Sequence, residues 1–402
     1  MPDIRPNPES GTVDIDYQLV EKSSSQFDLS GGIGRGYVIF QAGISLTNFS
    51  AQKFFDKKAW NPFPIGDGQK LSLRVQTNGD YYHAVSLSFT EPWLGGRKPN
   101  ALSVGVYYSY QDDGFWNTTG TSEYYIGILG GSVSLATRLK WPDDYFTFVH
   151  GLAYQQYNVK NYTTLTAMPT GISNNINYNF TLARNSVDQL IYPRQGSDIS
   201  LAAQMTFPYS LVNGKDYSSL SPAERYKWLE YYKINFRAAW YFNLFDDLVV
   251  STRARFGFLG QYNSKVGYSP FERFYLGGDG LTGYQLDGRE LVALRGYDES
   301  SLSPDGGGMV FDKYTMELRY PITLNEGASV YALAFFEAGN SWANFQSFEP
   351  FKMYRSVGVG LRIFMPMFGL LGVDWGYGLD AIPGDPTASG SHFHISINNS
   401  ID

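Results

Sequence analysis

Segments in which apolar and polar residues alternate recur along most of the chain. The segments 71–76 and 85–89 show the pattern clearly, with every second side chain apolar. A period of two predicts a β-strand whose two faces meet different surroundings. About 16 such segments can be counted, an even number as single-chain bacterial barrels require. They are 27–34, 41–49, 71–76, 85–89, 102–107, 123–140, 144–159, 172–185, 196–207, 227–243, 247–262, 310–322, 327–338, 354–364, 369–378 and 391–400.

The longest stretch without this pattern runs from residue 262 to residue 309. Loops of that length are uncommon in compact β proteins and are usually functional. Long polar connections at 112–122, 160–171 and 208–226 alternate with short ones, such as Asp246-Asp247. Short turns at one end of the strands and long loops at the other are typical of outer-membrane barrels.

The composition favours a membrane protein that crosses with strands. Charged residues are only 17% of the chain, below the usual quarter of a soluble domain. A helical membrane protein is excluded, since no run of about 18 apolar residues occurs. Aromatic residues, 17% of the chain, gather at the ends of the expected strands, as in Tyr81-Tyr82 and Trp240-Tyr241. Such clusters indicate girdles at the two membrane surfaces, although a β-sandwich core also favours aromatic residues. Together with the strand count, they predict an all-β fold, a 16-stranded antiparallel transmembrane β-barrel.

Several classes of chemistry are not indicated. The net charge of −7, without a basic cluster, argues against a nucleic-acid partner. The chain has no Cys and no motif of a hydrolase, nucleotide-binding or dinucleotide-binding enzyme. His392 and His394 share one strand face, but two imidazoles without a third ligand make a poor metal site. We therefore expect no catalytic residues, no cofactor and no metal.

The first residues differ from the rest. Val13, Ile15, Tyr17 and Leu19 alternate with polar residues and predict one half-buried strand. A lone strand is not stable in water, so it belongs to a larger domain or is tethered against the barrel. Met1-Pro2-Asp3 does not begin a signal peptide. We expect the chain to be a mature fragment of an exported protein.

The long loop carries a recognisable motif. Arg273, Phe274, Gly277 and Gly278, followed by Leu294-Arg295-Gly296-Tyr297, resemble the long-loop signature of the BamA family of outer-membrane assembly factors. The likeness continues in order along the chain, at 90–93, 192–197, 316–321, 335–340 and 393–397. The stretch 279–293 is longer than in the best-known members. The chain also ends in Ile401-Asp402, where the family has an aromatic residue.

The resemblance implies a domain order, a location and a function. Residues 1–22 would be the C-terminal remnant of the last periplasmic POTRA domain, and 23–402 the barrel, with its long extracellular loop folded into the lumen. The protein would lie in the outer membrane of a Gram-negative bacterium. It would fold and insert other β-barrel proteins there without covalent chemistry. Its partners would be outer-membrane lipids, unfolded β-barrel clients and accessory subunits of the assembly machinery.

The resemblance also implies a role for Arg295. The motif arginine is expected to meet acidic residues on the inner wall, here Glu317 and Glu337, and so to hold the loop as a latch. In a wet lumen such a pair contributes ~0–1 kcal/mol, whereas losing one partner in a dry site costs ~3–5 kcal/mol. The alternative is a solvated loop arginine without such a role.

A second expected site is a lateral seam between the first and last strands. An edge that opens there would offer a template to a client strand by β-augmentation. The seam residues are Phe27, Leu29, Gly31, Gly32 and Gly34 of the first strand and Phe393, Ile395 and Ile397 of the last. The glycines suit a seam that opens, because glycine weakens a strand, but they equally permit barrel curvature. Related barrels of two-partner secretion and, less favoured, passive porins remain alternative functions.

Overall fold

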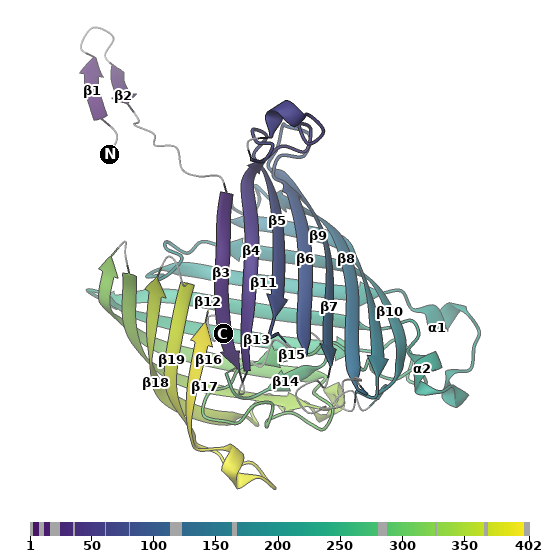
Figure 1. Cartoon of the computed structure of the whole chain (residues 1–402). Coiled ribbons are helices and arrows are strands. Elements are labelled where there is room, and N and C mark those ends of the chain that lie inside the picture. The colour runs from purple at the N-terminus through teal and green to yellow at the C-terminus, as the bar shows by residue number, and fades with distance from the viewer. Residues whose placement is uncertain are drawn as a thin grey trace.

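The computed structural model describes residues 3–7, 12–16, 25–34, 37–60, 62–79, 81–112, 123–162, 167–279, 288–325, 328–365 and 369–397. Sixteen strands form one sheet, and each pairs antiparallel with the strands next to it in the list that follows (Figure 1). The strands are, in chain order, β3 (Ser25–Gly34), β4 (Tyr37–Phe49), β5 (Gln69–Thr77), β6 (Tyr82–Glu91), β7 (Asn100–Asp112), β8 (Tyr125–Arg138), β9 (Phe146–Lys160), β10 (Gly171–Asn185), β11 (Gly196–Thr206), β12 (Tyr232–Phe245), β13 (Leu248–Gly260), β16 (Val310–Asn325), β17 (Ala328–Trp342), β18 (Tyr354–Met365), β19 (Gly369–Gly378) and β20 (Ser391–Ile397). The predicted fold class is confirmed.

The two faces of the sheet differ as the alternation predicts. On β5, Leu73 and Val75 are 41% and 45% exposed, and their partners on β6, Leu87 and Val85, are exposed to a similar extent. The residues between them are polar. Ser72 is buried, and its hydroxyl shares a hydrogen bond of 3.0 Å with the hydroxyl of Ser45 on β4. The outer face is therefore apolar and suited to lipid, and the inner face is polar.

Most of the buried apolar side chains lie where the long loop meets the inner wall. Phe271, Phe274, Leu276, Leu294 and Tyr297 of the loop pack in one cluster with wall residues that include Ile126, Tyr157, Leu259, Phe311 and Trp342. The aromatic rings of Tyr157 and Phe271 stack with their centroids 3.9 Å apart. The loop is thus folded into the barrel and supplies the core that the polar inner wall alone would lack.

The long loop contains regular structure that the sequence did not predict. β14 (Phe274–Leu276) and β15 (Glu290–Val292) form a two-stranded parallel sheet. β15 belongs to the stretch 279–293 that departs from the family pattern. Residues 280–287 of that stretch lie outside the described residues. The additional residues therefore end in a strand that pairs with the conserved motif of the same loop.

The structure differs from the strand predictions at two places. The first residues hold two strands where the sequence predicts one: β1 (Asp3–Asn7) and β2 (Thr12–Asp16) form an antiparallel pair, with Ile4 and Ile15 opposite each other in the register. Residues 17–22 lie outside the described residues, and the assignment of 1–22 to a POTRA domain stays a prediction. The strand expected at 227–243 starts only at Tyr232. The backbone of Lys227 and Leu229 instead bonds to Asn174, which holds residues 227–231 against β10.

The helices are short and lie in the connections. They are η1 (Lys57–Ala59), α1 (Tyr209–Val212), η2 (Tyr217–Ser219), α2 (Pro222–Arg225), η3 (Phe345–Ser347) and η4 (Pro386–Ala388). Ser221 caps α2 with a complete capping box. Within the described residues, no helix is long and apolar enough to cross a membrane.

Candidate functional site

Arg295 lies in the second half of the long loop and has no solvent exposure. Its Nη2 donates to Glu317 of β16 at 3.0 Å and to Glu337 of β17 at 2.9 Å, and its Nη1 donates to Asp374 of β19 at 3.1 Å. Its backbone N–H also donates to Glu337, at 2.9 Å. One guanidinium therefore joins the loop to three strands of the inner wall. The two acids expected from the sequence are both in contact, and Asp374 is a third partner that the sequence did not indicate.

The carboxylates around Arg295 are shared with cations of the wall itself. Glu317 also pairs with Arg253 at 3.0 Å and with Arg319 at 2.6 Å. Lys313 lies 3.1 Å from Glu337, and Arg362 lies 2.9 Å from Asp374. All of these side chains are at most 8% exposed. Each buried carboxylate thus has at least one cation besides Arg295, which lowers the cost of burying the cluster.

Electrostatics and packing both favour the charged guanidinium. Burial alone would lower the pKa of Arg295, but the attraction of Glu337, Glu317 and Asp374 outweighs it and holds that pKa above its ordinary value. The guanidinium carbon lies 3.5 Å from the centroid of the Phe335 ring, a cation–π contact in a site without water exposure. A lysine could not reproduce this arrangement, because only the planar fork of arginine reaches several acceptors and stacks at once.

Glycines on the inner wall let the loop backbone approach closely. The inward positions of β18 and β19 include Gly358, Gly360, Gly372, Gly376 and Gly378, which recur with a period of two. A Cβ added at Gly376 would lie 2.7 Å from the backbone N of Gly296, too close for any real contact. Gly296 itself has a φ of +85°, which favours glycine. The latch segment Leu294–Tyr297 therefore lies directly against the backbone of the inward glycines of β18 and β19, which we call the glycine floor.

The latch segment also reaches the last strand. The Gly296 N–H donates to Nε2 of His394 on β20 at 3.0 Å. His392 on the same strand lies 3.5 Å from Asp298. The Tyr297 hydroxyl donates to the Arg355 carbonyl of β18 at 2.7 Å. Among the described residues, no group of three or more acidic, Cys or His side chains could hold a metal ion. Both histidines face loop residues.

The first half of the motif shapes the loop rather than touching the ion-pair cluster. Arg273 donates to the Ser269 carbonyl at 2.8 Å and to the Gly306 carbonyl at 3.0 Å. Phe274 is fully buried, with its ring centroid 4.7 Å from that of Phe311. Gly277 and Gly278 have φ values of +128° and +72°, and Gly278 forms a bridge with Leu294. The motif residues thus brace the loop so that Arg295 meets its partners.

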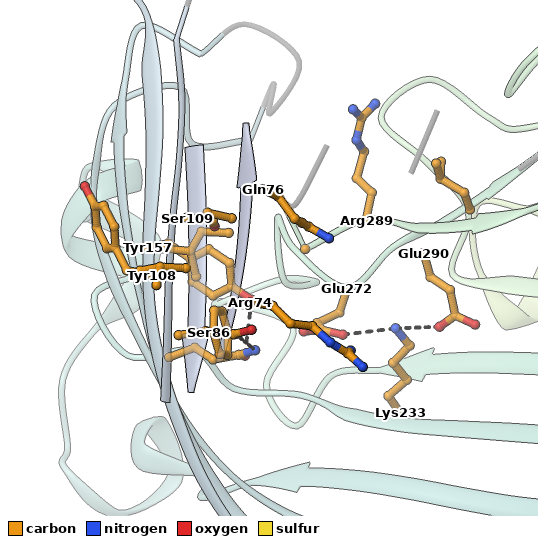
Figure 2. Close-up of a pocket in the computed structure, with 17 residues that line it drawn as sticks. Arg74, Gln76, Ser86, Tyr108, Ser109, Tyr157, Lys233, Glu272, Arg289 and Glu290 are labelled. Carbon is orange, nitrogen blue, oxygen red and sulfur yellow. Dashed lines mark hydrogen bonds and ion pairs between the residues drawn. The ribbon is translucent and has the colours of Figure 1, made fainter. Parts of the chain in front are cut away.

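A second ionic anchor, which was not predicted from the sequence, holds the other side of the loop. Lys233 of β12 lies between Glu272, at 3.0 Å, and Glu290 of β15, at 2.8 Å (Figure 2). Glu290 also pairs with Arg255 of β13 at 3.5 Å. These contacts hold β15 against the inner wall at β12 and β13. Lys233, Glu272 and Glu290 line a chamber of about 680 Å³ between the loop and β5–β9, into which Arg74 and Gln76 also point.

The expected seam residues lie on two strand edges that are not paired with each other. Among the described residues, β3 pairs only with β4 and β20 only with β19. Phe27 is 74% exposed, and Phe393 and Ile395 are 78% and 54% exposed. Leu29, Gly31, Gly32 and Gly34 pair with Ala42, Phe40, Ile39 and Tyr37 of β4, and Ile397 pairs with Leu371 of β19.

Replacing Arg295 by Ala should release the loop from the wall. We expect docking of the loop to weaken by about 3 kcal/mol, the lower end of the range for a broken buried pair, because each carboxylate keeps another cation. Cleavage by added protease within residues 261–309 of the detergent-folded barrel should then rise by roughly two orders of magnitude. Arg295→Lys should restore only part of the protection.

The matched control is Arg355→Ala, which removes an exposed ion pair with Asp380. Exposed pairs contribute ~0–1 kcal/mol, so cleavage should change less than about fivefold. Equal protection of the loop in wild type and in Arg295→Ala would contradict the latch.

Replacing Gly376 by Ala tests the glycine floor independently of charge. The added methyl group would meet the Gly296 backbone, so the loop must move outward at a cost of about 1–3 kcal/mol. Loop protection should fall although every ion pair partner is retained. The control is Gly105→Ala on β7, where the new Cβ would have ordinary neighbours at 3.7 and 3.8 Å. A loop that is equally protected in both variants would show that the close approach is unimportant.

Comparisons with known proteins agree with this architecture. Residues 65–400 match the Omp85 superfamily domain. The chain is 23% identical over 357 residues to the outer membrane protein assembly factor BamA of Neisseria meningitidis serogroup B, which covers 83% of this chain and 40% of that protein. The chain therefore spans less than half the length of that curated relative.

Solved structures show the same fold. The crystal structure of BamA from Haemophilus ducreyi lacking POTRA domains 1–3 superposes with a TM-score of 0.64 at 18% identity, covering 98% of this chain and 74% of that one. CdiB from Acinetobacter baumannii gives a TM-score of 0.54 at 15% identity, with 99% and 65% coverage. CdiB from Escherichia coli gives 0.56 at 11% identity, with 99% and 67% coverage. The chain belongs to the Omp85 superfamily of bacterial outer-membrane β-barrels, which are not enzymes.

Proposed function

We propose that this barrel folds and inserts other β-barrel proteins into the outer membrane through a seam between β3 and β20. The observation that carries the proposal is that these two strands, the ends of the sheet, form no ladder with each other in the described residues. Each edge presents backbone N–H and C=O groups that need a partner. In lipid, each unsatisfied group costs several kcal/mol, so an incoming strand that pairs with the edge is strongly favoured.

The distribution of the loop anchors supports an opening at this place. The ionic contacts of the loop fall on β12, β13, β16, β17 and β19. They bind the C-terminal half of the barrel to the loop as one unit. In the proposed opening, β3 moves away from this anchored unit and from β20. An exposed edge would then template a client strand by β-augmentation.

Unfolded β-barrel clients and outer-membrane lipids are the partners that this mechanism requires. Accessory subunits would bind the parts of the protein that precede the barrel.

Transport of a passenger through the lumen is the second candidate function. The chamber between the loop and β5–β9 supports it, because it leaves about 680 Å³ of space inside the barrel on that side. This is the arrangement that a two-partner secretion barrel would use. A porin would need the same space and would conduct steadily with the loop docked.

A disulfide across the seam separates these functions. The chain has no Cys, so Ser30→Cys with Ser396→Cys introduces a single pair. Ser396 is buried on the inner side of β20, and Ser30 pairs with Gln41, whose side chain bonds to chamber-lining Gln76 at 2.6 Å. We expect oxidation to slow the folding of an unfolded barrel client into vesicles at least tenfold and reduction to restore it.

The control places the disulfide inside an existing ladder. Ser72 and Ser88 are direct partners on β5 and β6, so Ser72→Cys with Ser88→Cys should leave client folding unchanged when oxidised. Equal client folding with the seam oxidised and reduced would refute the seam mechanism. Transport would be favoured if oxidation left client folding unchanged and a chain still passed through the lumen of the oxidised barrel.

A further inference from the structure

The connection between β4 and β5 is unusual for the end of the barrel at which it lies. It runs from Ser50 to Gly68, at the end opposite the long loop, at the top of Figure 1. The turn between β12 and β13 at the same end has only two residues, Asp246 and Asp247. The sequence pattern predicted short turns at this end, so the length of 50–68 needs a reason of its own.

Internal contacts give this connection a fixed shape. Asp56 caps η1 by accepting from the Lys58 backbone at 3.0 Å. The Trp60 indole donates to the Phe54 carbonyl at 2.9 Å, and Ser50 donates to Asp67 at 2.5 Å. The connection is therefore a built feature that presents a defined surface.

That surface continues the lipid-facing side of the barrel. Phe89 of β6 stands in the outward row with Leu87 and Val85 and has its ring centroid 6.5 Å from that of Phe49. Phe49 lies 6.3 Å from Phe54, and Phe54 lies 5.3 Å from Phe55. Ring contacts thus lead from the membrane face, through the buried Phe49, into the connection. The last of these rings, Phe55, is 91% exposed.

The charge around these aromatic side chains is positive. Lys53, Lys57, Lys58 and Lys70 outnumber Asp56 and Asp67 between residues 51 and 70, although the whole chain has a net charge of −7. Lys57 and Lys58 are exposed beside Phe55. Aromatic rings that project from a barrel rim, flanked by lysines, match the chemistry of a phospholipid surface: apolar below the headgroups and negatively charged at them.

We propose that residues 50–68 form an interfacial anchor that inserts Phe54, Phe55 and Trp60 into the leaflet at this end of the barrel. Lys53, Lys57 and Lys58 would contact the phosphates of the headgroups. The occupant is lipid rather than a protein, because the ring contacts lead into the connection from the lipid face of β4–β6. The anchor lies over the strands next to β3, so it fixes phospholipids beside that edge. This proposal does not depend on the proposed function.

A spin label at residue 55 tests the insertion directly. Phe55→Cys, labelled and folded into vesicles of phosphatidylethanolamine and phosphatidylglycerol, should collide several-fold more often with oxygen than with a water-soluble nickel complex. Phe55 is almost fully exposed, so the substitution leaves the barrel packing unchanged; heat-dependent gel mobility verifies folding. The control is Asp144→Cys, an exposed residue in the turn 139–145 at the same end, where the nickel complex should collide more often.

A charge variant tests the role of the lysines. Lys57→Glu with Lys58→Glu should reduce the depth of the label at residue 55 in the anionic vesicles and have a smaller effect in phosphatidylcholine. A label at residue 55 that is as accessible to nickel as the label at residue 144 would overturn the proposal. So would shielding that appears only after a second protein is added, since the occupant would then be that protein.

Discussion

The burial of one arginine among three carboxylates organises the interior of this barrel. Arg295 comes from the loop, whereas Glu317, Glu337 and Asp374 come from three different strands. A buried guanidinium is costly unless its charge is matched. The wall matches it with acids whose own charge is matched by Arg253, Arg319, Lys313 and Arg362. The loop position is thus specified by charge as well as by shape. Apolar contacts alone are not directional and would specify it less closely.

Close contact between the loop backbone and the wall backbone also contributes to docking of the loop. Gly376 and Gly296 approach so closely that neither position accepts a Cβ. The cost is entropic, because glycine weakens the strands that contain it. As a result, the loop backbone lies close enough to the wall for Arg295 to contact its three carboxylate partners. The inner wall of β18 and β19 is therefore adapted to hold the loop, and its strand stability is secondary to that fit.

Alternation and turn spacing were enough to predict the number and approximate positions of the strands, because the two faces of each strand meet such different surroundings. The resemblance of residues 273–278 and 294–297 to a known motif pointed to Arg295, Glu317 and Glu337. Asp374 could not be found, since its contact depends on the register of β19 against the loop. The alternating glycines from Gly358 to Gly378 were a readable signal of close backbone approach that the sequence analysis did not use. The anchor between Lys233 and Glu290 lay in a stretch without a family pattern, where spacing alone identifies no partner.

The two ends of the sheet differ in what holds them. The C-terminal strands are bound to the loop through Arg295, through the glycine floor and through the contact of Gly296 with His394 on β20. On the other side of the lumen, β5 contributes Arg74 and Gln76 to the chamber beside the loop. The connection 50–68 presents aromatic side chains to the outside. The ionic anchors seen between described side chains therefore lie on the part of the sheet that ends in β20, and the position of that part is the one that the buried guanidinium specifies.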